Sequence, residues 1–154
     1  MNHDVDATLR ELAAVGRDGK EFYEYAQLLA SGPLRARFAR AARAKAELLA
    51  LVASRTSPLH PDPVRVDTAA DPPAHELPTE WRQDLARSRS RLRRTAPETL
   101  VPVLDRLEQR VLAHYRTRLA ATQDRDTRAA LALLLPVLAE GPRALASDAE
   151  REAP

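Results

Sequence analysis

The chain has 154 residues with no cysteine, four glycines and twelve prolines, which fits one domain or two very small ones. The lack of cysteine excludes thiol catalysis and cysteine zinc sites. The net charge of +2 does not require a nucleic acid partner, and no apolar run or leader pattern indicates a membrane span or a signal peptide. We therefore expect a cytoplasmic protein. Leucine and alanine dominate and isoleucine is absent, which favours an all-α fold.

Two amphipathic helices are predicted at the start of the chain, over about 6–30 and 33–54, with Gly32 and Pro33 marking a tight turn between them. The apolar seam of the first helix contains Leu9, Leu12, Val15, Phe22, Tyr25, Ala26 and Leu29. The seam of the second contains Leu34, Phe38, Ala41, Lys45, Leu48 and Val52. One lysine therefore interrupts an apolar stripe in a helical hairpin over 6–54.

A proline-rich stretch over about 55–78 predicts an irregular crossover, followed by a short helix over 80–94. Trp81, Leu85, Ser88 and Leu92 share one face of this helix. Its other faces carry Arg82, Arg87, Arg89, Arg91, Arg93 and Arg94. These six arginines and one aspartate give a local charge of +5. They form a candidate anion-binding surface, although arginines on a solvated face need no ligand.

Two further helices are predicted over about 97–121 and 126–146, and Glu108 interrupts the apolar seam of the first of them. Pro136 and Pro142 predict a bend or break of the last helix near Gly141, and the tail from Ser147 is expected to fray. The chain is thus predicted to be a single domain over 1–154. Hairpins at 6–54 and 96–146 flank a crossover at 55–95 and make a four-helix bundle.

The two hairpins align at an offset of 90 residues, which pairs Asp18 with Glu108 and Tyr25 with Tyr115. Residues 16–26 read GRDGKEFYEYA and residues 110–119 read RVLAHYRTRL. Through these segments the chain resembles a bacterial ferritin-like domain family of unknown function. The resemblance implies a ferritin-like four-helix bundle with one crossover.

Metal-binding relatives in the wider superfamily, such as rubrerythrin, carry a Glu seven residues before Tyr on helices one and three, and Glu-x-x-His on helices two and four. The resemblance implies that Asp18 and Glu108 keep the first two positions. The two Glu-x-x-His units are replaced by Lys45 with Leu48 and by Leu138 with Gly141. A lysine would repel a cation there. We therefore expect no metal and no other cofactor, and a buried ion pair of Lys45 with Asp18 or Glu108.

No Ser-His-Asp grouping, phosphate-binding glycine loop or paired acid and base is visible. The sequence thus favours a non-enzymatic bundle, a protein-interaction or stress-related accessory protein that acts through a protein partner or as a homodimer. One alternative is a ferritin-like metal oxidase or iron-handling protein with an atypical site that uses Asp18, Glu108, Glu47 or His114. A second alternative is a binder of nucleic acid or acidic partners through the arginine-rich helix.

Overall fold

A computed structural model describes residues 3–56 and 76–146. Of the stretch predicted to be irregular, 55–78, residues 57–75 lie outside the described residues, as does the predicted frayed tail over 147–154. The described ends of that stretch belong to helices at Arg55 and over 76–78, so the prediction is wrong there. The described part contains helices and no strand: α1 (His3–Leu29), α2 (Gly32–Arg55), α3 (Glu76–Leu92), the short 3-10 helix η2 (Pro97–Leu100), α4 (Val101–Ala121) and α5 (Arg125–Leu145). The all-α prediction is therefore confirmed for this part of the chain. None of its helices is both long and apolar enough to span a membrane.

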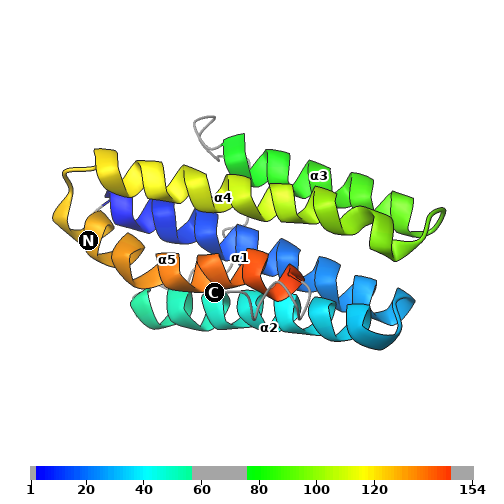
Figure 1. The fold of residues 1–154 in the computed structure, drawn as a ribbon. Helices are drawn as coiled ribbons and strands as arrows, with labels where there is room; N and C mark the ends of the chain where they lie inside the picture. The colour runs from blue at the N-terminus through cyan, green and yellow to red at the C-terminus, as the bar shows by residue number, and fades with distance from the viewer. Residues whose placement is uncertain (1–2, 57–75, 147–154) are drawn as a thin grey trace.

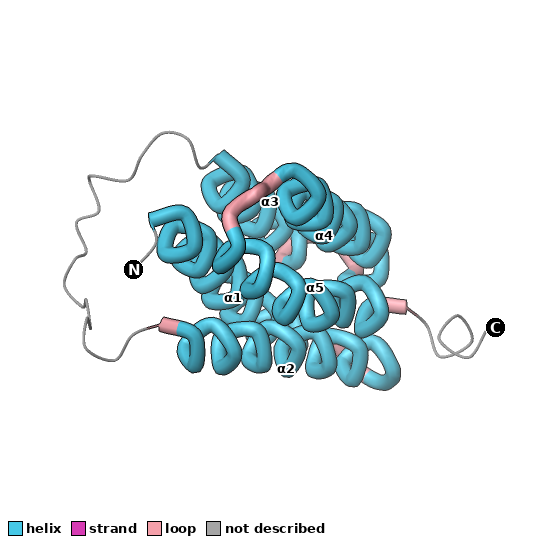
Figure 2. The backbone as a smooth tube through the Cα atoms, turned by 90° about the vertical axis from the view of Figure 1, so that its left-hand side faces the viewer, coloured by secondary structure: helices cyan, strands magenta, loops and turns pink. Residues whose placement is uncertain are grey.

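The five α-helices lie lengthwise beside one another (Figure 1). The colour gradient shows α1 and α5 running in one direction and α2 and α4 in the opposite one. Helix α1 packs on α2 and α3, and α5 packs on α2 and α4. Figure 2 shows α3 and α4 on one side, α2 on the other, and α1 and α5 between them. The space that these helices enclose holds the core.

Helix α3 belongs to this core rather than to its periphery. It begins at Glu76, four residues before the predicted start, and buries Trp81, Leu85 and Leu92. Burial of a tryptophan and two leucines contributes several kcal/mol of hydrophobic free energy. The crossover helix is thus a fifth packed element.

The buried face of α1 differs from the predicted seam. Tyr23 is fully buried, whereas Tyr25 is only partly buried and Leu29 is 44% exposed. Because α1 contacts α2 on one side and α3 on another, its buried stripe is wide, and the apolar spacing alone did not show which tyrosine lies at its centre. Tyr23, and not Tyr25, therefore reaches the centre of the molecule.

Polar contacts complete several helix ends. Gly32 adopts a positive φ of 59° at the turn between α1 and α2, a conformation that glycine adopts without steric cost. The Arg35 Nε donates to the carbonyl oxygens of Gln27, at 3.2 Å, and Ala30, at 2.9 Å, and so satisfies acceptors where α1 ends. The Asp124 side chain accepts the Thr127 N–H at 2.8 Å and caps α5.

Helix α5 continues through both of its prolines. It is α-helical from Arg125 to Leu145, so of the predicted bend or break near Gly141 the break does not occur. Gly141 and Pro142 are buried, and Arg37 donates from Nε to the Leu145 carbonyl oxygen at 2.9 Å. Packing against neighbouring helices thus holds a segment that its own propensity disfavours.

Pro136, which lies inside α5 and is exposed, provides a test of this conclusion. An alanine there would restore a backbone N–H and remove the ring that crowds the preceding turn. We expect Pro136→Ala to raise the free energy of unfolding by about 1–3 kcal/mol in denaturant melts. Ala132→Gly, at an exposed site one turn earlier, should lower it by about 1 kcal/mol. An unchanged or lower stability of Pro136→Ala would contradict the assignment of a continuous helix.

Candidate functional site

A buried ion pair lies at the centre of the molecule. Lys45 of α2 and Glu108 of α4 are 2% and 1% exposed, and the Lys45 Nζ donates to the Glu108 Oε1 at 2.5 Å. A buried charge is tolerated only when an opposite charge and hydrogen bonds compensate for its lost hydration. Each of these two residues therefore requires the other.

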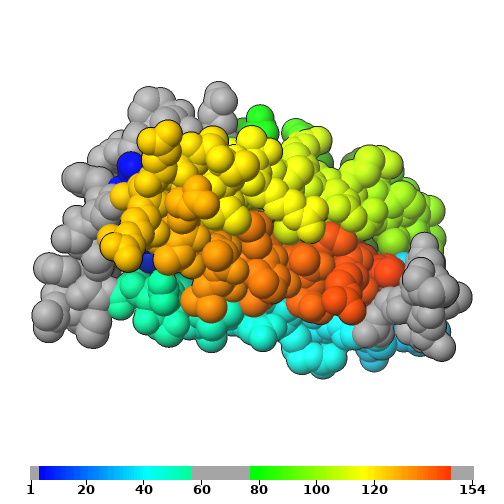
Figure 3. Space-filling model, turned by 60° about the vertical axis from the view of Figure 1, so that its left-hand side comes forward, coloured from blue at the N-terminus to red at the C-terminus, as the bar shows by residue number. Residues whose placement is uncertain are grey.

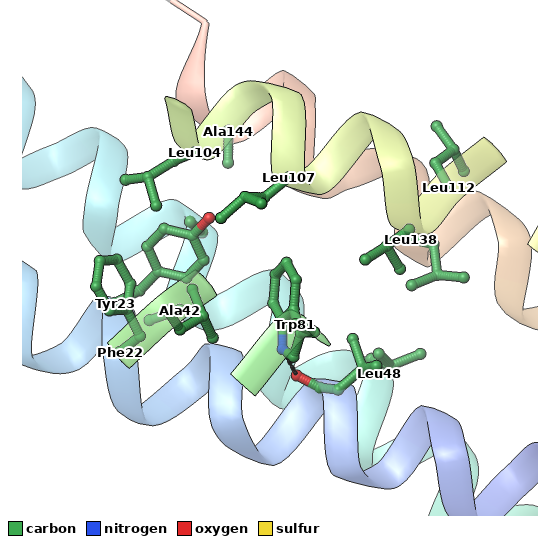
Figure 4. Close-up of a cluster of buried hydrophobic side chains, with 14 of the residues drawn as sticks. Phe22, Tyr23, Ala42, Leu48, Trp81, Leu104, Leu107, Leu112, Leu138 and Ala144 are labelled. Atoms are coloured by element: carbon green, nitrogen blue, oxygen red, sulfur yellow. Dashed lines mark hydrogen bonds between the residues drawn. The ribbon is translucent and has the colours of Figure 1, made fainter. Parts of the chain in front are cut away.

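Tyr23 of α1 completes the hydrogen bonding of the carboxylate. Its hydroxyl donates to the Glu108 Oε2 at 2.6 Å, and the ring points toward the α4 residues Leu104 and Leu107 (Figure 4). Burial, and then the negative charge of Glu108, raise the pKa of Tyr23 well above its ordinary value of 10.0. The phenol thus stays protonated and acts as a donor to Glu108.

Trp81 of α3 covers the ammonium group from another side. The Lys45 Nζ lies 5.3 Å from the centroid of its ring, within range of a cation–π interaction. The indole N–H donates to the Val15 carbonyl oxygen of α1 at 3.2 Å, which fixes the ring (Figure 4). A helix from the crossover thereby contributes directly to the central cluster.

Two glycines provide the space that this cluster occupies. A Cβ at Gly19 of α1 would lie 3.0 Å from the Lys45 Cε. At Gly141 of α5 it would overlap the Glu108 carboxylate and lie 3.2 Å from the Lys45 Nζ. Any larger residue at position 141 would displace the carboxylate. Glycine inside a helix costs about 1 kcal/mol relative to alanine, and here it admits the ion pair.

The central cluster, defined as Lys45, Glu108, Tyr23, Trp81 and the two glycines, therefore involves all five α-helices. Its charged members neutralise each other, and its polar side chains are enclosed. A substrate has no access to them. Within residues 3–56 and 76–146, no group of three or more His, Cys, Asp or Glu side chains is placed to hold a metal ion.

Asp18, which was expected at the centre, lies elsewhere. Its side chain is 18% exposed and accepts from the Arg82 Nε of α3 at 3.1 Å. One residue along α1, Gly19 faces Lys45 instead. A step of one residue turns the side chain by about 100°, so Asp18 is directed toward α3 rather than toward the centre. Of the two carboxylates expected as partners of Lys45, the structure brings Glu108 to it and directs Asp18 to Arg82.

A second buried polar contact joins α1 and α4. The Glu11 Oε1 accepts from the Tyr115 hydroxyl at 2.9 Å and from the Arg118 Nη1 at 2.8 Å. Burial, followed by the charge of Glu11, raises the pKa of Tyr115. Each of α1 and α4 thus supplies one buried carboxylate that accepts from a tyrosine of the other helix.

The remaining residues proposed for an atypical metal site do not converge. His114 is exposed on α4, with its ring edge-on to Tyr115 at 4.8 Å between centroids. Glu47 is exposed on α2 and lines a surface groove between α2 and α5. Neither contacts Lys45 or Glu108, so the described residues give these positions no shared site.

The arginine-rich helix divides into two halves. Near its start, Arg82 pairs with Asp18, and Arg87 pairs with Asp84, which also accepts from Arg110. Near its end, the Arg89 guanidinium lies 4.0 Å from the centroid of the Tyr25 ring, and the Arg93 Nε donates to the Tyr25 hydroxyl at 3.0 Å.

Only the second half keeps uncompensated charge. Among the described residues, the four arginines of this half form no ion pair with a carboxylate: Arg89, Arg91, Arg93 and Arg94. Of the predicted anion-binding surface, this part would meet an anion without a competing carboxylate among the described residues.

The apolar spacing of the sequence marks neither Glu11 nor Gly19 as part of a buried contact, and it does not distinguish Tyr23 from Tyr25. A glycine inside a helical pattern often makes room for a neighbouring side chain. Gly19 and Gly141 could therefore have indicated a large buried side chain beside each of them. Tyr23 follows Gly19 by one helical turn and therefore lies on the same face. Glu11 and Glu108 are each next to a leucine in the sequence: Glu11 precedes Leu12, and Glu108 follows Leu107.

Comparisons of the chain with protein-family models, with curated proteins and with solved structures find no match. Its function is therefore argued from its own geometry.

Truncation of Lys45 tests the ion pair. Lys45→Ala would leave the Glu108 carboxylate buried beside a cavity, and we expect a loss of about 3–5 kcal/mol in denaturant melts. The triple change Lys45→Met, Glu108→Met and Tyr23→Phe removes every partner at similar volume and should be close to neutral or stabilising.

The exposed pair of Arg82 with Asp18 offers a matched control. Arg82→Ala should cost no more than about 1 kcal/mol, because water screens this pair. If Lys45→Ala also cost less than about 1 kcal/mol, Lys45 would be solvated and the central cluster would be refuted.

Proposed function

We propose that this chain is a ferritin-like helical bundle that has lost its metal site and acts through protein contacts rather than catalysis. The observation that carries the proposal is the Lys45–Glu108 pair. At the centre, where a carboxylate bundle of this type would hold cations, an ammonium group neutralises a carboxylate. The positive charge of the lysine takes the place of the positive charge of a metal.

The helix directions support the ferritin-like part of the proposal. In Figure 1, α1 and α2 form one antiparallel hairpin and α4 and α5 form another, with α2 and α4 running the same way. A parallel second and third long helix requires a crossover along the bundle, which is the connection of ferritin-like folds. On this interpretation α3 is an additional helix on the crossover, inserted where it covers Lys45.

The enclosure of the cluster supports the non-catalytic part. A general acid or base must come within about 3 Å of a substrate proton, directly or through one water. Lys45, Glu108 and Tyr23 are all at most 2% exposed and are already bonded to one another. Their role in the proposal is to hold the bundle in one arrangement, which leaves the outer helix faces for partners.

Metal analysis tests this function against the oxidase alternative. After expression with added iron, we expect purified protein to contain far less than one iron atom per chain and to show no ferroxidase activity. Glu108→Gln is the matched control, because it removes the central carboxylate without altering its size. About two iron atoms per chain, lost in Glu108→Gln, would overturn the proposal in favour of a di-iron protein.

A second candidate function follows from the uncompensated arginines at the end of α3. Arg89 and Arg93 are both held by Tyr25, a neutral group, and keep their full charge. Guanidinium groups at this spacing suit the phosphates of a nucleic acid backbone. Under this proposal, the chain binds nucleic acid without sequence preference at the α3 end.

Paired double variants test this second function. The double variant Arg89→Gln with Arg93→Gln should weaken binding to a fluorescent oligonucleotide about tenfold or more. The slope of log affinity against log salt concentration should fall by about one to two, which corresponds to the loss of one to two phosphate contacts. Arg82→Gln with Arg87→Gln removes the same charge from the half that carboxylates already neutralise, and should have a smaller effect. Equal effects of the two variants, or no binding at about 50 mM salt, would rule out this site.

A further inference from the structure

A groove of about 480 Å³ runs between α2 and α5 on the surface of the molecule. Figure 3 shows α5 lying along α2 on one face of the molecule. Three alanines, Ala44, Ala46 and Ala144, contribute small side chains to the groove. The charged residues of the groove are Arg40, Arg43, Arg143, Glu47 and Glu140.

These charges are separated along the groove. The groove is lined by residues 40–47 of α2 and 140–144 of α5, so these two segments lie beside each other. Because α2 and α5 run in opposite directions (Figure 1), Arg40 and Arg143 lie toward one end of the groove, with Arg43 next to Arg40 along α2. Glu47 and Glu140 lie toward the other end. The groove is therefore basic in one half and acidic in the other.

Most of these groups remain available to a partner. Arg43 and Glu47 are exposed and, within the described part of the chain, form no ion pair. Arg143 and Glu140 are 74% and 49% exposed, and their ion pair is long, at 3.7 Å. Such an exposed pair contributes little stability and can exchange its partners.

From this arrangement we infer that the groove binds a second copy of the chain in a two-fold symmetric dimer. This inference rests on the proposed function, since it names the partner of a bundle that works through protein contacts. A uniformly acidic partner would be repelled by one half of the groove, and a uniformly basic partner by the other half. A second copy presents both halves and is complementary to both.

The charge order also fixes the direction of the two-fold axis. The axis lies in the interface and at right angles to the helices, so that α2 faces α2 and α5 faces α5 in antiparallel pairs. Arg43 then meets Glu47 of the other copy, and Arg143 meets Glu140. An axis parallel to the helices would instead bring the arginines of α2 and α5 together. Each contact occurs twice by symmetry.

Charge reversal tests the interface in the full chain. In sedimentation equilibrium, we expect the unmodified protein to be dimeric and Arg43→Glu and Glu47→Arg to be monomeric at the same concentration. Each reversal brings like charges together at both symmetric contacts, and its dissociation constant should rise on the order of 100-fold. Arg91→Glu, the same charge change on α3, should remain dimeric.

Mixing the two variants gives the decisive result. In a mixed dimer, the glutamate introduced by Arg43→Glu meets the arginine introduced by Glu47→Arg, and at the second contact the natural Glu47 meets the natural Arg43. A dimer should therefore form from two monomeric proteins. A monomeric unmodified protein would overturn the inference, as would reversals that stay dimeric or a mixture that stays monomeric. None of these results alters the metal content, so failure of the dimer is distinguishable from failure of the proposed function.

Discussion

The structure depends on the compensation of one buried lysine. Lys45 brings a positive charge into the centre of a helical bundle, and the neighbouring residues on every helix meet its requirements: Glu108 supplies the opposite charge, Tyr23 holds that carboxylate, and Trp81 covers the ammonium group. Gly19 and Gly141 leave the space. Since an unpaired charge there costs several kcal/mol, other arrangements of the helices are disfavoured. The pair thus selects one packing more than it adds stability.

This constraint also explains features outside the centre. Helix α5 passes close to Glu108 only because residue 141 lacks a side chain, and it remains helical through two prolines because its buried face is held by α2 and α4. Helix α3 is drawn into the core by Trp81, which contacts both the lysine and the backbone of α1. Because the buried polar groups are bonded to one another, we propose that partners bind at the outer faces of the helices. In our proposals, the polar groove between α2 and α5 and the arginines near Tyr25 are the surfaces that bind partners.

The sequence predicted the helices well because their apolar periods are long and regular, and it predicted a charged pair because Lys45 and Glu108 each interrupt such a period. It did not show which tyrosine would be the third partner. Tyr23 and Tyr25 are two residues apart on a helix buried along two sides, and spacing alone cannot decide which one faces the centre. Asp18 was misplaced for the same reason, since alignment of the repeats through Tyr25 rotated the helix by one position. The continuity of α5 depends on tertiary contacts that outweigh local proline effects, which no local pattern reveals.

The most direct test of the central ion pair is a proton–nitrogen NMR spectrum of the lysine ammonium groups. The chain has only two lysines, and Lys20, whose side chain is 38% exposed, serves as an internal reference for rapid exchange with water. A buried Lys45 bonded to Glu108 should give a slowly exchanging ammonium signal that disappears in Lys45→Met and shifts in Glu108→Gln, while no protected signal comes from Lys20. If no lysine signal were protected from exchange in the folded protein, Lys45 would be in contact with water, and the account of a charge-compensated centre would be contradicted.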